Sequence, residues 1–139
     1  MMKQLLFILA LVLCFAQVGR AQTIRNTSNS ALITIDDRGY VRTTGNSVLA
    51  RIESNGTIRD NSNRFIGKIE DDGTIRDRNN SYLGKVESNG TVRNPSNSVL
   101  GKVESDGTVR DRNNHTLGTA RGVPMRVAAI YFFFGFFRQ

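Results

Sequence analysis

Residues 73–106 read GTIRDRNNSYLGKVESN GTVRNPSNSVLGKVESD, which are two consecutive copies of one 17-residue unit. The glycine that begins the unit recurs at Gly39, Gly56, Gly73, Gly90 and Gly107, and the same phase extended backward begins a first unit at Gln22. Six units therefore span residues 22–123. Such a period indicates an architecture in which units too small to fold alone share one core.

Apolar residues recur at three positions of the unit, counting the glycine as position 1. Position 3 is always β-branched, position 11 is always Leu or Ile, and position 14 is Ile or Val except in the last unit, which has Ala120. We predict that these positions form the core. Because positions 11 and 14 are three apart, both can face inward only if Gly67, Gly84, Gly101 and Gly118 mark a bulge or bend. Positions 3 and 11 are Ile24, Val41, Ile58, Ile75, Val92, Val109 and Leu32, Leu49, Ile66, Leu83, Leu100, Leu117.

Turn residues separate these short apolar runs. Asn-Gly or Asp-Gly precedes four of the repeated units, at 55–56, 72–73, 89–90 and 106–107, and predicts two-residue type I′ hairpins. The weaker Arg38-Gly39 boundary makes five predicted hairpins. The other connection, exemplified by residues 77–81, is rich in Asn, Asp and Ser and is expected to be a wider turn. No helix is expected within residues 22–123.

The ends of the repeat indicate how the hairpins assemble. The first unit lacks a preceding strand and the last lacks a following one, so Thr23 to Arg25 is expected to pair with the segment at residues 117–120. This pairing would close a ring and remove exposed strand edges. The predicted fold is all-β: a radial, propeller-like closed array of five β-hairpins.

The N-terminal segment, residues 1–21, has the pattern of a secretory signal peptide. Lys3 precedes an apolar run, and small residues stand at Gly19 and Ala21 before the expected cleavage site. The predicted location is therefore outside the cytoplasm: the periplasm, the outer-membrane surface or the extracellular space. The remaining chain divides into a repeat domain, 22–123, and an apolar aromatic segment, 124–139.

Composition argues against catalysis. Cys14, the single cysteine, lies in the leader, and His115 is the single histidine. Zinc sites and His-dependent nucleophiles therefore lack their ligands and partners, so we predict a protein that is not an enzyme, with no metal and no cofactor. Loss of Lys3 and Arg20 lowers the net charge from +7 to +5, with basic and acidic residues interleaved, which argues against a nucleic-acid partner.

The units with the pattern R-D-x-x-N-x-x-L-G-K-V-E-S-D-G-T, together with the final segment AAIYFFF at 128–134, resemble the five-fold beta-flower proteins of Gram-negative bacteria. The resemblance covers about residues 22–137. It implies a radial array of hairpin petals around a central axis. It implies no catalytic residues, because none is established for the family.

Two polar series occupy fixed positions in the units. Arginine at position 4 includes Arg42, Arg59, Arg76, Arg93 and Arg110, and asparagine at position 8 includes Asn63, Asn80 and Asn97. One hypothesis makes them a rim that binds an anionic ligand through guanidinium groups. The other, which we favour, pairs each arginine with the glutamate three residues before the glycine, gives each asparagine a left-handed turn conformation, and makes Asp60, Asp77 and Asp111 form Asx-turns.

The C-terminal segment has two interpretations. It contains Tyr131, Phe132, Phe133, Phe134, Phe136 and Phe137. In the interpretation we favour, it folds as a strand or plug on the ring and adds large side chains to a small core. In the other, it stays exposed and attaches the protein to a membrane or an envelope component.

These observations predict a non-catalytic exported binding or scaffold module of unknown ligand. An anionic ligand or an envelope component is the expected kind of partner. The alternative function is an envelope or membrane interaction through the aromatic segment.

Overall fold

In the computed structural model, which describes residues 22–138, twelve short strands precede one helix, α2 (Met125–Phe134). The predicted signal peptide, residues 1–21, lies outside the described residues. The strands are β1 (Gln22–Asn26), β2 (Ala31–Ile35), β3 (Tyr40–Thr43), β4 (Val48–Ile52), β5 (Thr57–Asp60), β6 (Phe65–Ile69), β7 (Thr74–Asp77), β8 (Tyr82–Val86), β9 (Thr91–Arg93), β10 (Val99–Val103), β11 (Thr108–Asp111) and β12 (Thr116–Thr119).

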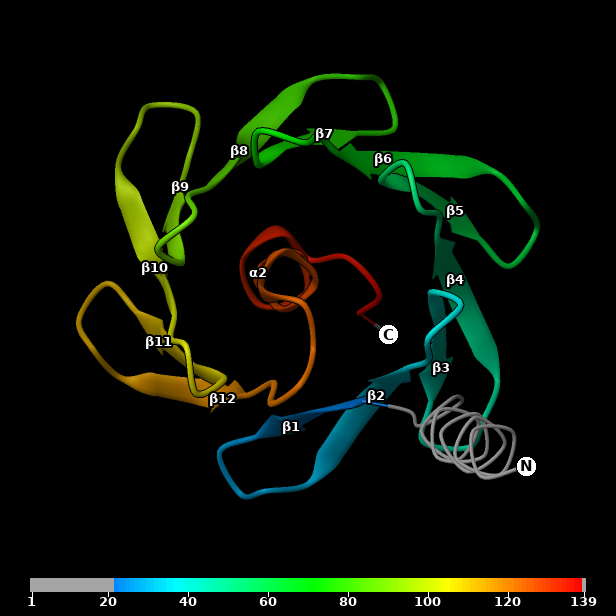
Figure 1. Cartoon of the computed structure of the whole chain (residues 1–139), viewed down its shortest axis with the longest axis horizontal. Helices are drawn as coiled ribbons and strands as arrows, with labels where there is room; N and C mark the ends of the chain where they lie inside the picture. The colour runs from blue at the N-terminus through cyan, green and yellow to red at the C-terminus, as the bar shows by residue number, and fades with distance from the viewer. Residues whose placement is uncertain (1–21, 139) are drawn as a thin grey trace, which may run out of the picture.

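The strands form a closed antiparallel ring. Each strand pairs with its neighbours in the sequence, and β1 pairs with β12, where Arg25 lies opposite Thr119 and Asn26 lies opposite Gly118. The predicted closure between the two ends of the repeat is therefore confirmed. Among the described strands none is left at a free edge, where unpaired backbone groups would invite association with other chains. Figure 1 shows the ring encircling α2.

Both kinds of turn are three-residue loops. At a glycine turn, Gly73 N–H donates to Glu70 O (3.0 Å) and Glu70 N–H donates to Thr74 O (2.8 Å). At an asparagine turn, Asn80 N–H donates to Asp77 O (3.0 Å) in the same pattern. The third loop residue is left-handed in each, with φ 94° at Gly73 and 64° at Asn80. This is the three-residue hairpin loop that combines a type I turn with one left-handed residue.

Three predictions about the turns are therefore wrong, the first being that the asparagine turn is the wider of the two. A two-residue type I′ turn would require positive φ at the residue before the glycine as well, and the positive φ values of the described glycine turns fall on the glycine alone. The five hairpins predicted at the glycine turns are present, but five is too low a count for the array, because the asparagine turns join antiparallel strands too. The pairs β1–β2, β3–β4, β5–β6, β7–β8, β9–β10 and β11–β12 are the petals that project outward in Figure 1.

A bulge in each petal lets the apolar positions share one interior. In β7 and β8, Ile75 lies opposite Gly84 and Arg76 lies opposite Tyr82, so Leu83 is the extra residue. Similar shifts occur in the other petals, which confirms the predicted irregularity at the repeated glycines. The position 3 side chains are all fully buried. Position 14 is buried except at half-buried Ile52, and the bulged position 11 residues are half-buried against the core.

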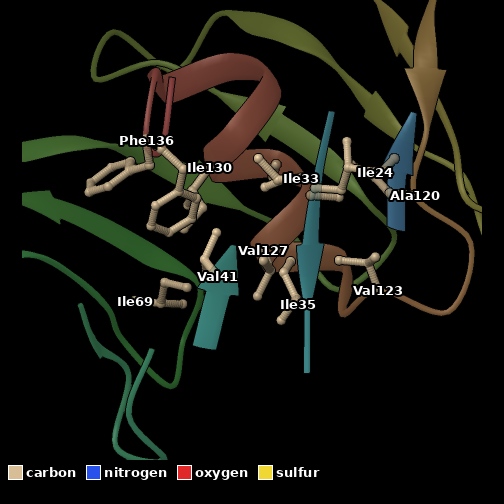
Figure 2. Close-up of a cluster of buried hydrophobic side chains, with 14 of the residues drawn as sticks. Ile24, Ile33, Ile35, Val41, Ile69, Ala120, Val123, Val127, Ile130 and Phe136 are labelled. Atoms are coloured by element: carbon tan, nitrogen blue, oxygen red, sulfur yellow. The ribbon is translucent and has the colours of Figure 1, made fainter. Parts of the chain in front are cut away.

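The centre of the ring is occupied by α2. Its buried residues are Val127, Ala128, Ala129 and Ile130, and Figure 2 shows Val127 and Ile130 among side chains from the surrounding strands. The possibility that the tail forms a strand is wrong, because the closed ring offers no free edge for pairing. A helix satisfies its backbone hydrogen bonds internally and can stand in an apolar interior. It ends at Gly135, whose φ of 74° is the left-handed conformation common at helix C-termini.

Candidate functional site

The arginines of the predicted rim lie on the outer wall of the ring, away from its axis. In each unit the position 3 side chain points inward, so the next residue, the arginine, points outward. Arg93 Nε donates to Glu87 Oε1 at 2.6 Å, and Arg93 Nη1 donates to the carbonyl of Asn97 at 3.1 Å. The arginine therefore links the glycine turn before its strand to the asparagine turn after that strand.

The same contacts recur around the ring. Glu53, Glu70 and Glu104 accept from Arg59, Arg76 and Arg110, and Arg42 lies 4.0 Å from Asp36. The carbonyls of Asn29, Asn46, Asn63, Asn80 and Asn114 accept from the arginines of their own units. The preferred ion-pair interpretation thus has its predicted geometry. The arginines do not converge on one pocket, and pairs this exposed contribute only about 0–1 kcal/mol each.

The asparagines and aspartates support the turns. Asn29, Asn46, Asn63, Asn80, Asn97 and Asn114 all have positive φ, as expected. Asp111 Oδ1 accepts from the backbone N–H groups of Asn113 and His115, both at 2.9 Å, which is the predicted Asx-turn. The His115 N–H is the main reason that the pKa of Asp111 lies below its ordinary value of 3.8. Asn26 makes the same two contacts in the first petal, so a charge is not required there.

The phenylalanines of the tail lie against glycines of different strands. A Cβ atom on Gly67 would stand 2.6 Å from Cε1 of Phe136, and one on Gly101 would stand 2.6 Å from Cε1 of Phe133. Gly84 and Gly118 face Phe134 and Phe132 in the same way. A helix turns once in about 3.6 residues, so consecutive phenylalanines point to different sides of the ring. Sequence reasoning assigned these glycines to bulges and missed this second role, although their 17-residue recurrence beside one phenylalanine-rich segment was a usable signal.

The aromatic residues differ in exposure. Phe136 and Phe137 are buried, whereas Tyr131, Phe132, Phe133 and Phe134 are half-buried and pack against the core. Phe65 and Tyr82, which lie opposite Arg59 and Arg76, are exposed on the outer wall. No functional role was predicted for these two residues.

Within residues 22–138, no group of three or more His, Cys, Asp or Glu side chains is arranged so that it could hold a metal ion. None of the helices in that range is long and apolar enough to cross a membrane. A hollow of about 420 Å³ lies between the start of α2 and the 36–39 turn, lined in part by Gln22, Asp36, Ile52 and Val127. Asp36 there accepts from the backbone of its own turn and so acts as a turn residue.

A closed ring of short antiparallel hairpins around a central helix defines a small repeat protein whose interior is apolar and whose polar side chains face outward. The chain belongs to the five-fold beta-flower protein family, which matches it over residues 21–137. The predicted family is therefore confirmed. Searches among curated proteins and among solved structures found no match.

Proposed function

We propose that this protein is an exported, non-catalytic binding or scaffold module that acts through its outer surface. The observation that carries the proposal is the filled interior. Aliphatic side chains from the strands and α2 form one buried cluster at the place where a ring would otherwise enclose a ligand. Binding is therefore assigned to the walls and ends of the ring.

The aromatic segment has a structural part in this proposal: it completes the core. Phe136 and Phe137 belong to the buried cluster, and the half-buried phenylalanines pack on it. Burying aromatic rings supplies apolar contact that units of Thr, Asn, Gly and Arg lack. Replacing Phe132, Phe133 and Phe134 together by serine is expected to abolish folding, as judged by circular dichroism. A soluble, folded variant would contradict this part of the proposal.

The proposed ligand on the outer wall is anionic. Cations face each other across neighbouring strands at Arg51–Arg59, Lys68–Arg76, Lys85–Arg93 and Lys102–Arg110. Each pair has one glutamate beside it, so one positive charge per pair is not balanced by the ion pairs described above. Like charges directly opposite each other destabilise a sheet, and an acidic ligand would relieve that repulsion.

Calorimetric titration with sulfated and carboxylated oligosaccharides tests the anionic ligand. Binding is expected to weaken in Arg76→Ala and Arg93→Ala, each retaining the fold, and to stay unchanged in the matched control Arg38→Ala, which removes an exposed arginine from a glycine turn. Absence of binding by any probe, or equal loss in the control, would contradict the proposal.

Export from a Gram-negative cell to the periplasm, the outer-membrane surface or the medium is part of the same proposal. The apolar leader with its small residues at Gly19 and Ala21 supports it. Mass spectrometry of the purified protein is expected to give Gln22 as the first residue. A protein that retains its leader and fractionates with the cytoplasm would contradict export.

A second candidate function is attachment to an envelope membrane through Tyr131 to Phe137. The half-exposed state of Tyr131, Phe132, Phe133 and Phe134 favours it, because these rings contribute both to the core and to the surface.

A further inference from the structure

The two ends of the ring differ, and the direction of α2 tells them apart. At the start of the helix, Arg126 Nη1 donates to the carbonyl of Glu70 in a glycine turn at 3.1 Å. Met125 Sδ would lie 3.4 Å from a Cβ on Gly90, in the next glycine turn. The helix ends at Gly135, which is exposed. The C-terminal half of α2 therefore points to the opposite end of the ring, where the bulges lead into the asparagine turns.

That opposite end carries an apolar surface, which we call the aromatic face. Its centre consists of the half-buried Tyr131, Phe132, Phe133 and Phe134. Each bulged Leu or Ile directly precedes the position 12 residue, which in four strands is the glycine under a phenyl ring, and is itself half-buried. The bulged residues that surround the centre are Leu32, Leu49, Ile66, Leu83, Leu100 and Leu117. A broad apolar surface of this kind on a small protein indicates an interaction site.

The charges of the chain are also unequally divided between the two ends. The asparagine turns contain three carboxylates, Asp60, Asp77 and Asp111. The glycine turns contain all the others: Asp36, Asp37, Glu53, Glu70, Asp71, Asp72, Glu87, Glu104 and Asp106. The acidic side chains are thus concentrated at the end of the ring away from the aromatic face.

Arginines border the aromatic face. Arg78 and Arg112 lie exposed in asparagine turns, whereas Arg64, which is also exposed beside such a turn, lies 4.0 Å from Asp60 in an ion pair. Arg138 is exposed beyond Gly135, where its Nε and Nη2 atoms donate to the carbonyls of Tyr131 and Phe132 at 3.3 and 3.0 Å. Its guanidinium also lies 5.7 Å from the centroid of the Tyr131 ring. A cation is therefore held at the centre of the apolar surface as well as at its border.

We propose that the aromatic face docks on a lipid surface that contains anionic headgroups. Aromatic rings partition to the boundary between headgroups and acyl chains, and arginines at the same level attract anionic lipids. A second copy seated face to face would bring the two sets of arginines together, and this like-charge contact disfavours a dimer as the occupant. The inference rests on the second candidate function, attachment to an envelope membrane. It adds the surface that makes the contact and the class of lipid.

Vesicle flotation tests the inference, with phosphatidylcholine vesicles that contain or lack phosphatidylglycerol. Each protein is purified from a host that exports it, and its N-terminal residue is determined. Only variants with the same N-terminus are compared. The test variant is Arg78→Glu with Arg112→Glu, at the aromatic face. The matched control is Arg38→Glu with Arg121→Glu, which makes the same change in net charge with exposed residues at the glycine-turn end.

The unmodified protein is expected to float with the anionic vesicles only, and the test variant to bind them about tenfold or more weakly. The control is expected to keep at least most of the binding. No flotation, or equal losses in the two charge variants, would overturn the proposal. Protein that binds soluble acidic oligosaccharides but no vesicle would overturn the lipid inference while leaving the outer-wall function intact.

A second readout uses the absence of tryptophan from the chain. Emission from a Phe133→Trp variant is expected to shift to the blue when anionic vesicles are added, whereas emission from a Tyr40→Trp variant on the outer wall is expected to stay unchanged. If the protein floats but the emission maximum of Phe133→Trp does not shift when vesicles are added, the membrane contact lies elsewhere and the inference is contradicted. A dimer in solution that buries the same tryptophan without lipid would do so as well.

Discussion

Replacing Gly67 by alanine tests whether the tail phenylalanines and the strand glycines fit together as one core. The added Cβ would stand 2.6 Å from the Phe136 ring and 2.8 Å from the carbonyl oxygen of Arg76, both closer than real Cβ contacts. Overpacking of this kind costs about 1–3 kcal/mol. Phe136→Ala removes the ring and is expected to cost about 3–5 kcal/mol. A loss of about 2 kcal/mol moves a urea midpoint by about 1 M.

The double variant makes the test specific. Once the Phe136 ring is absent, the methyl group of Gly67→Ala occupies part of the space that the ring leaves. The stability lost in the double variant is therefore expected to be smaller, by about 1 kcal/mol or more, than the sum of the losses in the two single variants. Urea unfolding followed by far-ultraviolet circular dichroism measures all three. The control is Gly45→Ala, whose Cβ meets only Thr43 Oγ1 at 3.7 Å and should change stability by about 0.5 kcal/mol or less. Strict additivity would refute the packing of Phe136 on Gly67.

Three further substitutions test the turns and the outer wall. Asn80→Ala is expected to lose about 1–2 kcal/mol, because alanine resists the left-handed conformation, while Asn80→Gly loses little; equal losses in urea unfolding would count against the turn assignment. Arg93→Ala is expected to lower the free energy of unfolding by about 1 kcal/mol or less in the same assay, since both side chains of its ion pair with Glu87 are about a third exposed. A loss above about 3 kcal/mol would contradict the weak contribution expected of so exposed an ion pair. The pKa of Asp111 is lowered in the fold, so the stability that its carboxylate contributes is present above about pH 4 and is lost as the pH falls through the lowered pKa. Asp111→Asn is therefore expected to reduce the fall in melting temperature on acidification. An unchanged dependence of the melting temperature on pH would contradict this.

The repeat made much of the fold predictable. Because position 3 is β-branched in every copy, one pattern identified six fully buried residues, from Ile24 to Val109. The unpaired first and last strands identified the closure of β1 on β12. The asparagine conformations and the arginine ion pairs followed from local chemistry, since the residues that form them lie within a few positions of one turn.

The parts that were missed depend on surroundings that one segment does not encode. An Asn-Gly or Asp-Gly pair serves a type I′ turn as well as a three-residue loop, and the paired strands select between them. The apolar run at 127–137 has no period that separates helix from strand. Its form is decided by the closed ring, which provides an apolar hole and no edge. The contact between Gly101 and Phe133 joins residues distant in sequence and is visible only in the folded chain.

The pairing of β1 with β12 carries the whole architecture, and a cysteine cross-link measures it directly. Arg25→Cys with Thr119→Cys places two thiols directly opposite each other, and Arg25→Cys with Arg78→Cys, which pairs β1 with a petal that is not its neighbour, is the control, both in a Cys14→Ser background. Mild oxidation followed by mass spectrometry is expected to give an intramolecular disulfide in the first protein and none in the second. Failure of the first pair to cross-link in the folded protein, or equal cross-linking of both, would contradict a ring closed through its two ends.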